Sequence, residues 1–196
     1  MSYATKADLK DVFNGPASLF YQATAATITD NELALAPDMD VPCKIDTLSF
    51  EQGEPSMEHY KVYGLASDWV SASEPGDITI SFRVPTKHTD ILKLAYGADA
   101  VVPVSNGASL TIGTAAAQEF GTGNGIVLKN HKVQGTWAIL NDAGDQLLVI
   151  NNTALYASLV MDTDTKGVVA IDFSGTIESD GSNPDIFFFK KDSASS

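Results

Sequence analysis

Apolar and polar residues alternate along 78–84, with Ile, Phe and Val at one set of positions and Thr, Ser and Arg at the other. This period of two predicts a strand with one buried face. After Pro85 the apolar residues take helical spacing over 89–96, where we expect Thr89 to cap a short helix. Asp90 in the first turn suits the helix dipole, and Gly97 ends the pattern. The stretch therefore predicts a strand followed directly by one helix.

Most of the chain after Gly97 has the pattern of further strands. Asn106-Gly107 predicts the type I′ turn of a hairpin within 101–112. The glycine-rich stretch 113–125 is expected to be a flexible connection. The turn residues 141–144 separate two long patterns, and the remaining strands are expected at 126–140, 146–161, 168–177 and 186–191.

The first part of the chain gives weaker signals. A helical face over 5–13 predicts either one or two turns of helix or an arm that orders only against a neighbour. A strand is expected over 18–28, and alternation over 43–50 contains a slip that suggests a bulge or a bend. We expect a long loop over 51–75, in which the alternating patch 59–65 forms a small hairpin arm. Loops of this length in compact domains are usually functional.

These patterns predict a mainly β fold: two packed antiparallel sheets in a sandwich or barrel, flanked by one short helix at about 89–96 and preceded by an N-terminal helix or arm. The 196 residues and the apolar fraction of 44% suit one substantial core. We therefore divide the chain into an N-terminal arm (1–17), a single β domain (18–191) and a disordered tail (192–196).

The net charge of −13 argues against a nucleic-acid clamp and against docking on anionic lipid, because both need clustered Lys and Arg. The segment between 28 and 58 contains eight acidic residues and a single basic residue, Lys44. Cys43 is alone, so it excludes an intrachain disulfide. The polar start predicts no secretory signal, and the apolar runs have only strand length, so we expect a soluble, unexported protein.

Residues that could carry chemistry are scattered. His59, His88 and His131 share no metal-ligand spacing. The segment 162–167 lacks the ligands of a calcium loop, and 180–185 is a turn that could bind calcium weakly. No nucleotide-binding or nucleophile-elbow motif occurs. We therefore expect no enzyme activity, no cofactor and no metal.

The stretch "DITISFRVPTKHTDILKLAYG", followed by a glycine-rich region, resembles the strand–helix segment of bacteriophage tail tube (major tail) proteins. The stretch from Gly135 to Pro184 resembles their C-terminal strands, and the resemblance extends over roughly 19–184. That family shares its fold with the tube protein of type VI secretion. Six copies form a ring, and stacked rings form the conduit for DNA.

The resemblance implies self-association and contacts with other tail proteins: tape measure, tail terminator and baseplate or tip. It implies location in the virion tail after synthesis in the bacterial cytoplasm, with DNA passing through but not tightly bound, and no membrane partner. It also implies roles for three sets of residues. They are an inter-ring loop with Glu51, Glu54, Met57, Tyr60, Tyr63 and Trp69; a subunit-boundary helix with Asp90, Ile91, Lys93 and Leu94; and an acidic lumen with Asp30, Glu32, Asp38 and Asp40.

Two other classes of function stay open. A carbohydrate- or peptide-binding sandwich would use Trp69, Trp137 and the six tyrosines as a stacking platform. We expect Trp137, within "GTWAIL", to lie in the core instead. An enzyme built on scattered carboxylates has no motif in its favour. The acidic stretch 30–40 and the glycine-rich stretch 113–125 depart from a minimal tube subunit.

Overall fold

The computed structural model describes residues 15–29, 32–60, 63–64, 70–74, 76–85, 88–105, 109–110, 118–119, 121–162 and 168–191. In these residues the chain is mainly β and contains one α-helix, α1 (Thr89–Tyr96), which confirms the expected fold class. The expected N-terminal helix, and the expected tail at 192–196, lie outside them.

Eight antiparallel strands form one large sheet, in the order β4-β1-β13-β14-β15-β8-β5, with β16 also paired to β14. The long strands appear where the alternation predicts them, except that the strand expected over 126–140 begins only at Lys132. The strands are β1 (Pro16–Gln22), β4 (Met39–Val41), β5 (Ser49–Gln52), β8 (Ile78–Val84), β13 (Lys132–Asn141), β14 (Gln146–Asp162), β15 (Val168–Ile177) and β16 (Ile186–Lys190).

The 17-residue strand β14 belongs to both halves of this sheet. Its first five residues pair with β16, whereas the residues from Thr153 onward pair with β15. Asn152, with φ of 51°, lies at the change of partner. The side chain of Asn151 is fully buried there, and its Nδ2 donates to the carbonyl of Pro184 at 2.9 Å. The strand therefore changes course at a defined point.

The sheet folds over onto itself around Trp137. In the strand order, Phe82 on β8 lies three strands away from Trp137 on β13, about 14 Å in a flat sheet. The two ring centroids are only 4.7 Å apart. Tyr21 and Phe173 contact the same indole, with centroids at 5.0 and 6.0 Å. The two packed layers expected from the sequence are thus two halves of one continuous sheet.

Helix α1 covers this core. Ile91, Leu92, Ala95 and Tyr96 are buried, and Leu94 is half-buried against the same cluster. The cap differs from the expected one, because Thr89 is already helical. His88 precedes it in an extended conformation, and its Nδ1 accepts the N–H of Asp90 at 3.4 Å. Gly97 ends the helix as expected, with φ of 96° and its N–H donated to the Lys93 carbonyl at 2.9 Å.

A second, smaller core lies on the other face of β13 and β14. It contains Ala26, Ala138 and Val149 and is covered by the hairpin of β2 (Thr27–Thr29) and β3 (Glu32–Ala34). The single strand expected over 18–28 is therefore divided. The chain leaves β1 after Gln22 and crosses the sheet, where the N–H of Ala26 donates to Oδ1 of Asn151 at 3.0 Å.

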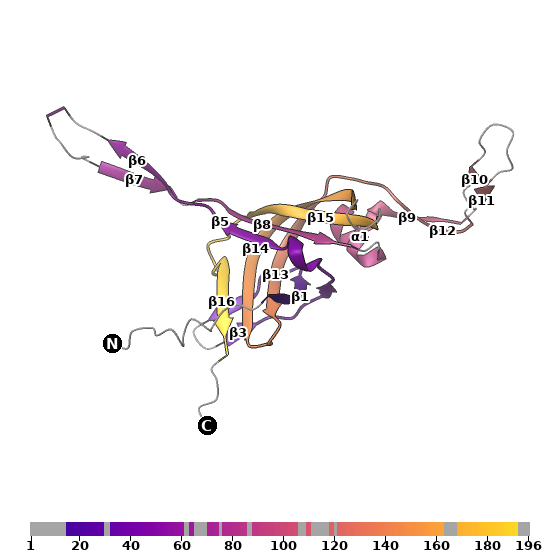
Figure 1. Cartoon of the computed structure of the whole chain (residues 1–196), viewed down its shortest axis with the longest axis horizontal. Coiled ribbons are helices and arrows are strands. Elements are labelled where there is room, and N and C mark those ends of the chain that lie inside the picture. Colours follow the sequence, from indigo (N-terminus) through magenta and orange to yellow (C-terminus); the bar gives the residue numbers. More distant parts are fainter. Residues whose placement is uncertain are drawn as a thin grey trace, which may run out of the picture.

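Two hairpins project from the body in different directions (Figure 1). The first arm is formed by β6 (Ser56–Tyr60) and β7 (Val70–Glu74), on strands that continue outward from β5 and β8. The second arm is formed by β9 (Val101–Val104) and β12 (Gly123–Ile126). Further out along it, β10 (Ser109–Leu110) pairs with β11 (Gln118–Glu119).

Two local expectations need correction. The stretch 51–75 is not a loop throughout, because β5 extends to Gln52 and the arm strands lie at 56–60 and 70–74, which include only His59 and Tyr60 of the expected patch. The expected 101–112 hairpin does not form, because β9 pairs with β12 across a longer connection. Of the two forms expected for the slip within 43–50, a bulge or a bend, the structure has the bend, as the 3₁₀ turn η2 (Ile45–Thr47).

Candidate functional site

Hydroxyl groups line the solvent-facing side of the half of the sheet that contains β14, β15, β8 and β5. Because paired residues of antiparallel strands share a face, Tyr156, Ser174, Ser81 and Ser49 form one row across β14, β15, β8 and β5. Neighbouring positions on these strands, such as Phe82 and Phe173, point into the core. We call this surface the hydroxyl face. It comprises Ser49, Thr79, Ser81, Ser158, Ser174 and Thr176.

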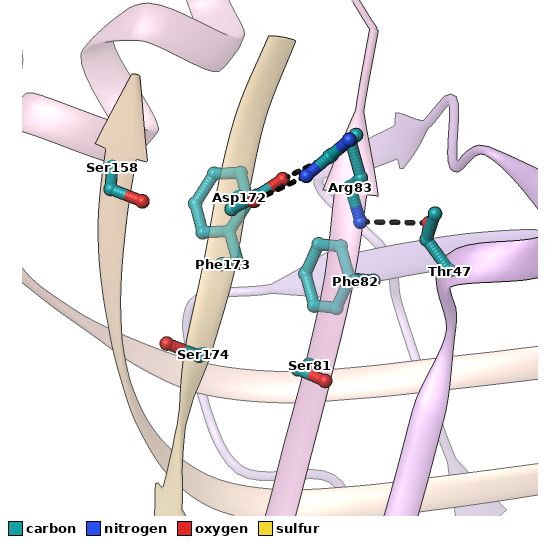
Figure 2. Close-up of a pocket in the computed structure, with 8 residues that line it drawn as sticks. All are labelled: Thr47, Ser81, Phe82, Arg83, Ser158, Asp172, Phe173 and Ser174. Carbon is teal, nitrogen blue, oxygen red and sulfur yellow. Dashed lines mark hydrogen bonds and ion pairs between the residues drawn. The ribbon is translucent and has the colours of Figure 1, made fainter. Parts of the chain in front are cut away.

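An ion pair crosses the middle of the hydroxyl face (Figure 2). The guanidinium of Arg83 donates from Nε to Oδ1 of Asp172 at 2.6 Å and from Nη2 to Oδ2 at 2.8 Å. The two side chains remain 27% and 33% exposed. The backbone N–H of Arg83 donates to Oγ1 of Thr47 at 3.0 Å. These residues and the serines around them line a shallow hollow of about 290 Å³.

A second ion pair lies at the edge of the same face. Lys132 on β13 is opposite Tyr156, so its side chain leaves on the same side. Its Nζ is 2.5 Å from Oε2 of Glu178. On the described strands β13, β14, β15, β8 and β5, Arg83 and Lys132 are the cations on this side, and each has a carboxylate partner. The carboxylate of Glu51, a residue paired with Thr79, also lies on this side of the sheet.

The first arm meets the body at a pair of glycines. The N–H of Gly53 donates to the carbonyl of Asp77 at 2.8 Å. A Cβ on Gly76 would lie 2.2 Å from the carbonyl oxygen of Gly53, so the two backbones touch. Beyond this neck the described side chains are exposed: Met57 is 61% exposed, and Glu54, Glu58 and Glu74 all face solvent.

The second arm is attached through the end of α1. The short helix η3 (Ala98–Ala100) leads into it, and the N–H of Val127 donates to the carbonyl of Ala100 at 2.9 Å. Nζ of Lys129 lies 2.6 Å from Oδ2 of Asp99, and this hydrogen bond and charge lower the pKa of Asp99. Exposed apolar side chains gather around this base: Val102, Ile126, Val127 and Leu128.

The structure separates the residues expected in an inter-ring loop. Glu54, Met57, Tyr60 and Tyr63 belong to the first arm. Glu51 does not, because it is part of β5 and lies opposite Thr79 in the main sheet. Trp69 lies outside the described residues.

The expected boundary helix is only partly available for contacts. Asp90 and Lys93 are exposed, whereas Ile91 is 3% exposed and belongs to the core. The expectation for Ile91 is therefore corrected, because its side chain is already covered by its own chain. Leu94 is half-buried against the same core.

The acidic residues expected in a lumen lie away from the hydroxyl face. Glu32 is on β3 and Asp40 is on the edge strand β4. Asp38 is held locally, since its Oδ2 accepts the N–H of Ala23 at 2.7 Å. Asp30 is not among the described residues. The sequence reasoning missed the hydroxyl face, although alternate Ser, Thr and charged residues in 78–84 and 172–176 were a usable signal.

The features considered for chemistry have local structural explanations. Oδ1 of Asp180 accepts the N–H groups of Ser182 at 2.8 Å and Asn183 at 3.2 Å, which lower the pKa of Asp180. Burial raises the pKa of the Cys43 thiol and so disfavours the thiolate. Across the described parts of the chain, no three His, Cys, Asp or Glu side chains are grouped to hold a metal ion.

The alternative stacking platform loses three of its members to the core. Trp137 is fully buried in the aromatic core, and Tyr21 and Tyr96 are buried as well. Tyr63 and Tyr156 are exposed, but one lies on the first arm and the other on β14.

No protein-family model and no curated protein matches the chain. In the part of the chain that the structure describes, no helix is long and apolar enough to cross a membrane. Fold and surface together define a class, a mainly β, sandwich-like protein with two projecting hairpins.

Proposed function

We propose that this protein is a structural subunit that assembles through its arms into rings, six copies each, stacked as a tube of the phage-tail kind. The observation that carries the proposal is the first arm. Its strands extend beyond the sheet, and from 53 to 59 every residue is exposed. An isolated two-stranded hairpin is marginally stable in water, so packing against another molecule would stabilise it.

The second arm supports the same proposal from another side of the body. Its apolar base, at Val102 and 126–128, leaves large side chains in contact with water. Two unlike contact surfaces that point away from each other suit head-to-tail association. Such contacts give rings when the rotation closes and filaments when it does not. A stacked tube uses both kinds of contact.

The charge suits a conduit for DNA. A chain of net charge −13 has little tendency to collect polyanions, and the cations of the hydroxyl face already have carboxylate partners. In this proposal the DNA passes through the tube without tight binding. Tape-measure, terminator and baseplate proteins meet the tube at its interior and ends.

Negative-stain electron microscopy with analytical ultracentrifugation tests the proposal. The purified chain, concentrated to the millimolar range and mixed with tail-initiating partners, should give rings with sixfold symmetry or stacked tubes. A matched sample with Met57→Asp and Leu128→Asp carries a charge on each arm, at exposed positions that should not disturb the fold. That variant should remain monomeric. A wild-type protein that stays monomeric under all these conditions would overturn the proposal.

A further inference from the structure

We propose that the hydroxyl face is the surface past which DNA moves, and that Asp172 and Glu178 keep it from adhering by neutralising Arg83 and Lys132. This inference rests on the proposed tube function and specifies which surface of each subunit turns toward the bore. It assigns to two carboxylates a role in lowering affinity rather than in binding.

A protein that holds DNA needs basic side chains within reach of the phosphates. Binding to the phosphate backbone comes from Lys and Arg, which displace condensed counterions. Arg is the stronger partner because its planar fork fits two phosphate oxygens at once. On the hydroxyl face, the Nε and Nη2 donors of Arg83 are directed at the two oxygens of Asp172, at 2.6 and 2.8 Å. A passing phosphate would have to displace a carboxylate of the same chain.

The same neutralisation occurs a second time. Nζ of Lys132 lies 2.5 Å from Oε2 of Glu178, on the same side of the sheet. Glu51 adds a single negative charge to this surface. A surface of paired charges has a small net potential, which is strongly screened beyond roughly 8 Å at physiological salt. DNA would be neither held nor strongly repelled.

The remaining side chains of the face suit movement along it. Ser158, Ser174, Thr79 and Thr176 are exposed and short, and Tyr156 is the large exposed side chain in the row. Hydroxyl groups exchange hydrogen bonds with water and phosphate without adding charge. Other surfaces fit less well. The base of the second arm is apolar, and Glu54, Glu58 and Glu74 make the first arm acidic.

Removing the neutralising carboxylates tests the inference. In the Asp172→Asn/Glu178→Gln variant, Arg83 and Lys132 lose their charged partners. The matched control, Asp90→Asn/Asp99→Asn, changes the net charge equally but lies at α1 and the second arm, where Asp99 pairs with Lys129. The probe is a short fluorescent DNA duplex, with binding followed by anisotropy at ~50 and ~200 mM salt.

We expect the wild type and the control to leave the duplex free, and the Asp172→Asn/Glu178→Gln variant to bind it. Its affinity should fall about tenfold between the two salt concentrations, as for two neutralised phosphates. Adding Arg83→Gln should remove most of the gain. Equal binding by the control, or no binding by the face variant, would overturn the inference.

A second variant protects the test against misfolding. Ser158→Lys/Ser174→Lys places two cations at exposed positions of the hydroxyl face, and Ala98→Lys/Ala143→Lys places two at exposed positions elsewhere. Only the first pair should bind the duplex in assembled rings, because only it lines the bore. Equal binding by both pairs overturns the inference. Electron microscopy of each sample reports assembly separately, and absence of rings counts against the proposed function. The carboxylate variant still tests the face in the monomer, where it is exposed.

Discussion

The first and second arms project from the same body but are attached to it in different ways. The first arm is an outward continuation of β5 and β8, so it keeps the strand direction of the main sheet and joins it at Gly53 and Gly76. The second arm begins after a buried helix and is tied down by the bond from Val127 to Ala100 and by the Lys129–Asp99 ion pair.

Their chemistry differs as well. The described part of the first arm is rich in Glu, whereas β9 and β12 contain no charged residue and adjoin exposed apolar side chains. The Glu-rich first arm and the apolar base of the second arm differ in how well each associates with a copy of itself. Like charges repel, whereas apolar surfaces associate. The two arms are therefore suited to different partners or to different surfaces of one partner.

The largest expected effect comes from removing the first arm. Replacing 54–75 by Asn-Gly, a sequence that favours a two-residue hairpin turn, should abolish ring and tube formation. The melting temperature should change by less than about 4 °C, because those removed side chains that the structure describes are exposed and contribute about 1 kcal/mol or less. Electron microscopy and thermal denaturation provide the two measurements. Replacing 105–122 in the same way shows whether the second arm is equally necessary, and assembly without the first arm would reverse the comparison.

Leu92→Ala should give the next largest effect, on stability. Leu92 is 4% exposed within the core under α1, so its truncation should cost about 2–5 kcal/mol in the free energy of unfolding. Lys93→Ala, exposed on the same helix, should cost less than about 0.5 kcal/mol. Chemical denaturation measures both. In Leu92→Ala, amide hydrogen exchange should become faster in β9 and β12, which follow α1, than in β6 and β7. Equal opening would mean that the helix supports both arms.

Gly76→Ala tests the neck of the first arm. The new Cβ would overlap the carbonyl of Gly53, at 2.2 Å, so the strands must separate at a cost of about 1–3 kcal/mol. Gly123→Ala on the second arm is the matched control, because a Cβ there meets nothing within 4 Å. Chemical denaturation should therefore give a lower free energy of unfolding for Gly76→Ala than for Gly123→Ala. A neutral Gly76→Ala would show that the neck is looser than its backbone contacts imply.

The smallest expected effect is a pH dependence confined to the second arm. Lys129 lowers the pKa of Asp99 below its unfolded value, so the pair stabilises the folded state above the unfolded pKa, near 4. That contribution is lost as the pH falls through the lower, folded pKa. An NMR titration should find the pKa of Asp99 raised toward its ordinary value in Lys129→Gln. An unchanged titration would show that the ion pair does not hold the base of the arm in solution.

The sequence by itself determined the elements whose signal is local. Strand 168–177 and helix 89–96 appear where alternation and helical spacing predict them, because one face of each must be buried. The turn at 141–144 and the end of the helix at Gly97 follow from residues adjacent in the chain. The burial of Trp137 and of Leu92 was also predictable from their apolar surroundings.

Only the tertiary structure decided which strands pair and which charges meet. Asn106-Gly107 favours a local hairpin, yet β9 pairs with Gly123–Ile126, since pairing depends on the whole arm and not on one dipeptide. The sequence places Glu51 in a loop, whereas in the structure it belongs to β5, which pairs with β8 at the edge of the sheet. Arg83 and Asp172 are 89 residues apart in sequence, and only the register of β8 against β15 brings them together. The physical reason is that side-chain period is set by neighbours along the chain, whereas register is set by the burial of a face against distant strands.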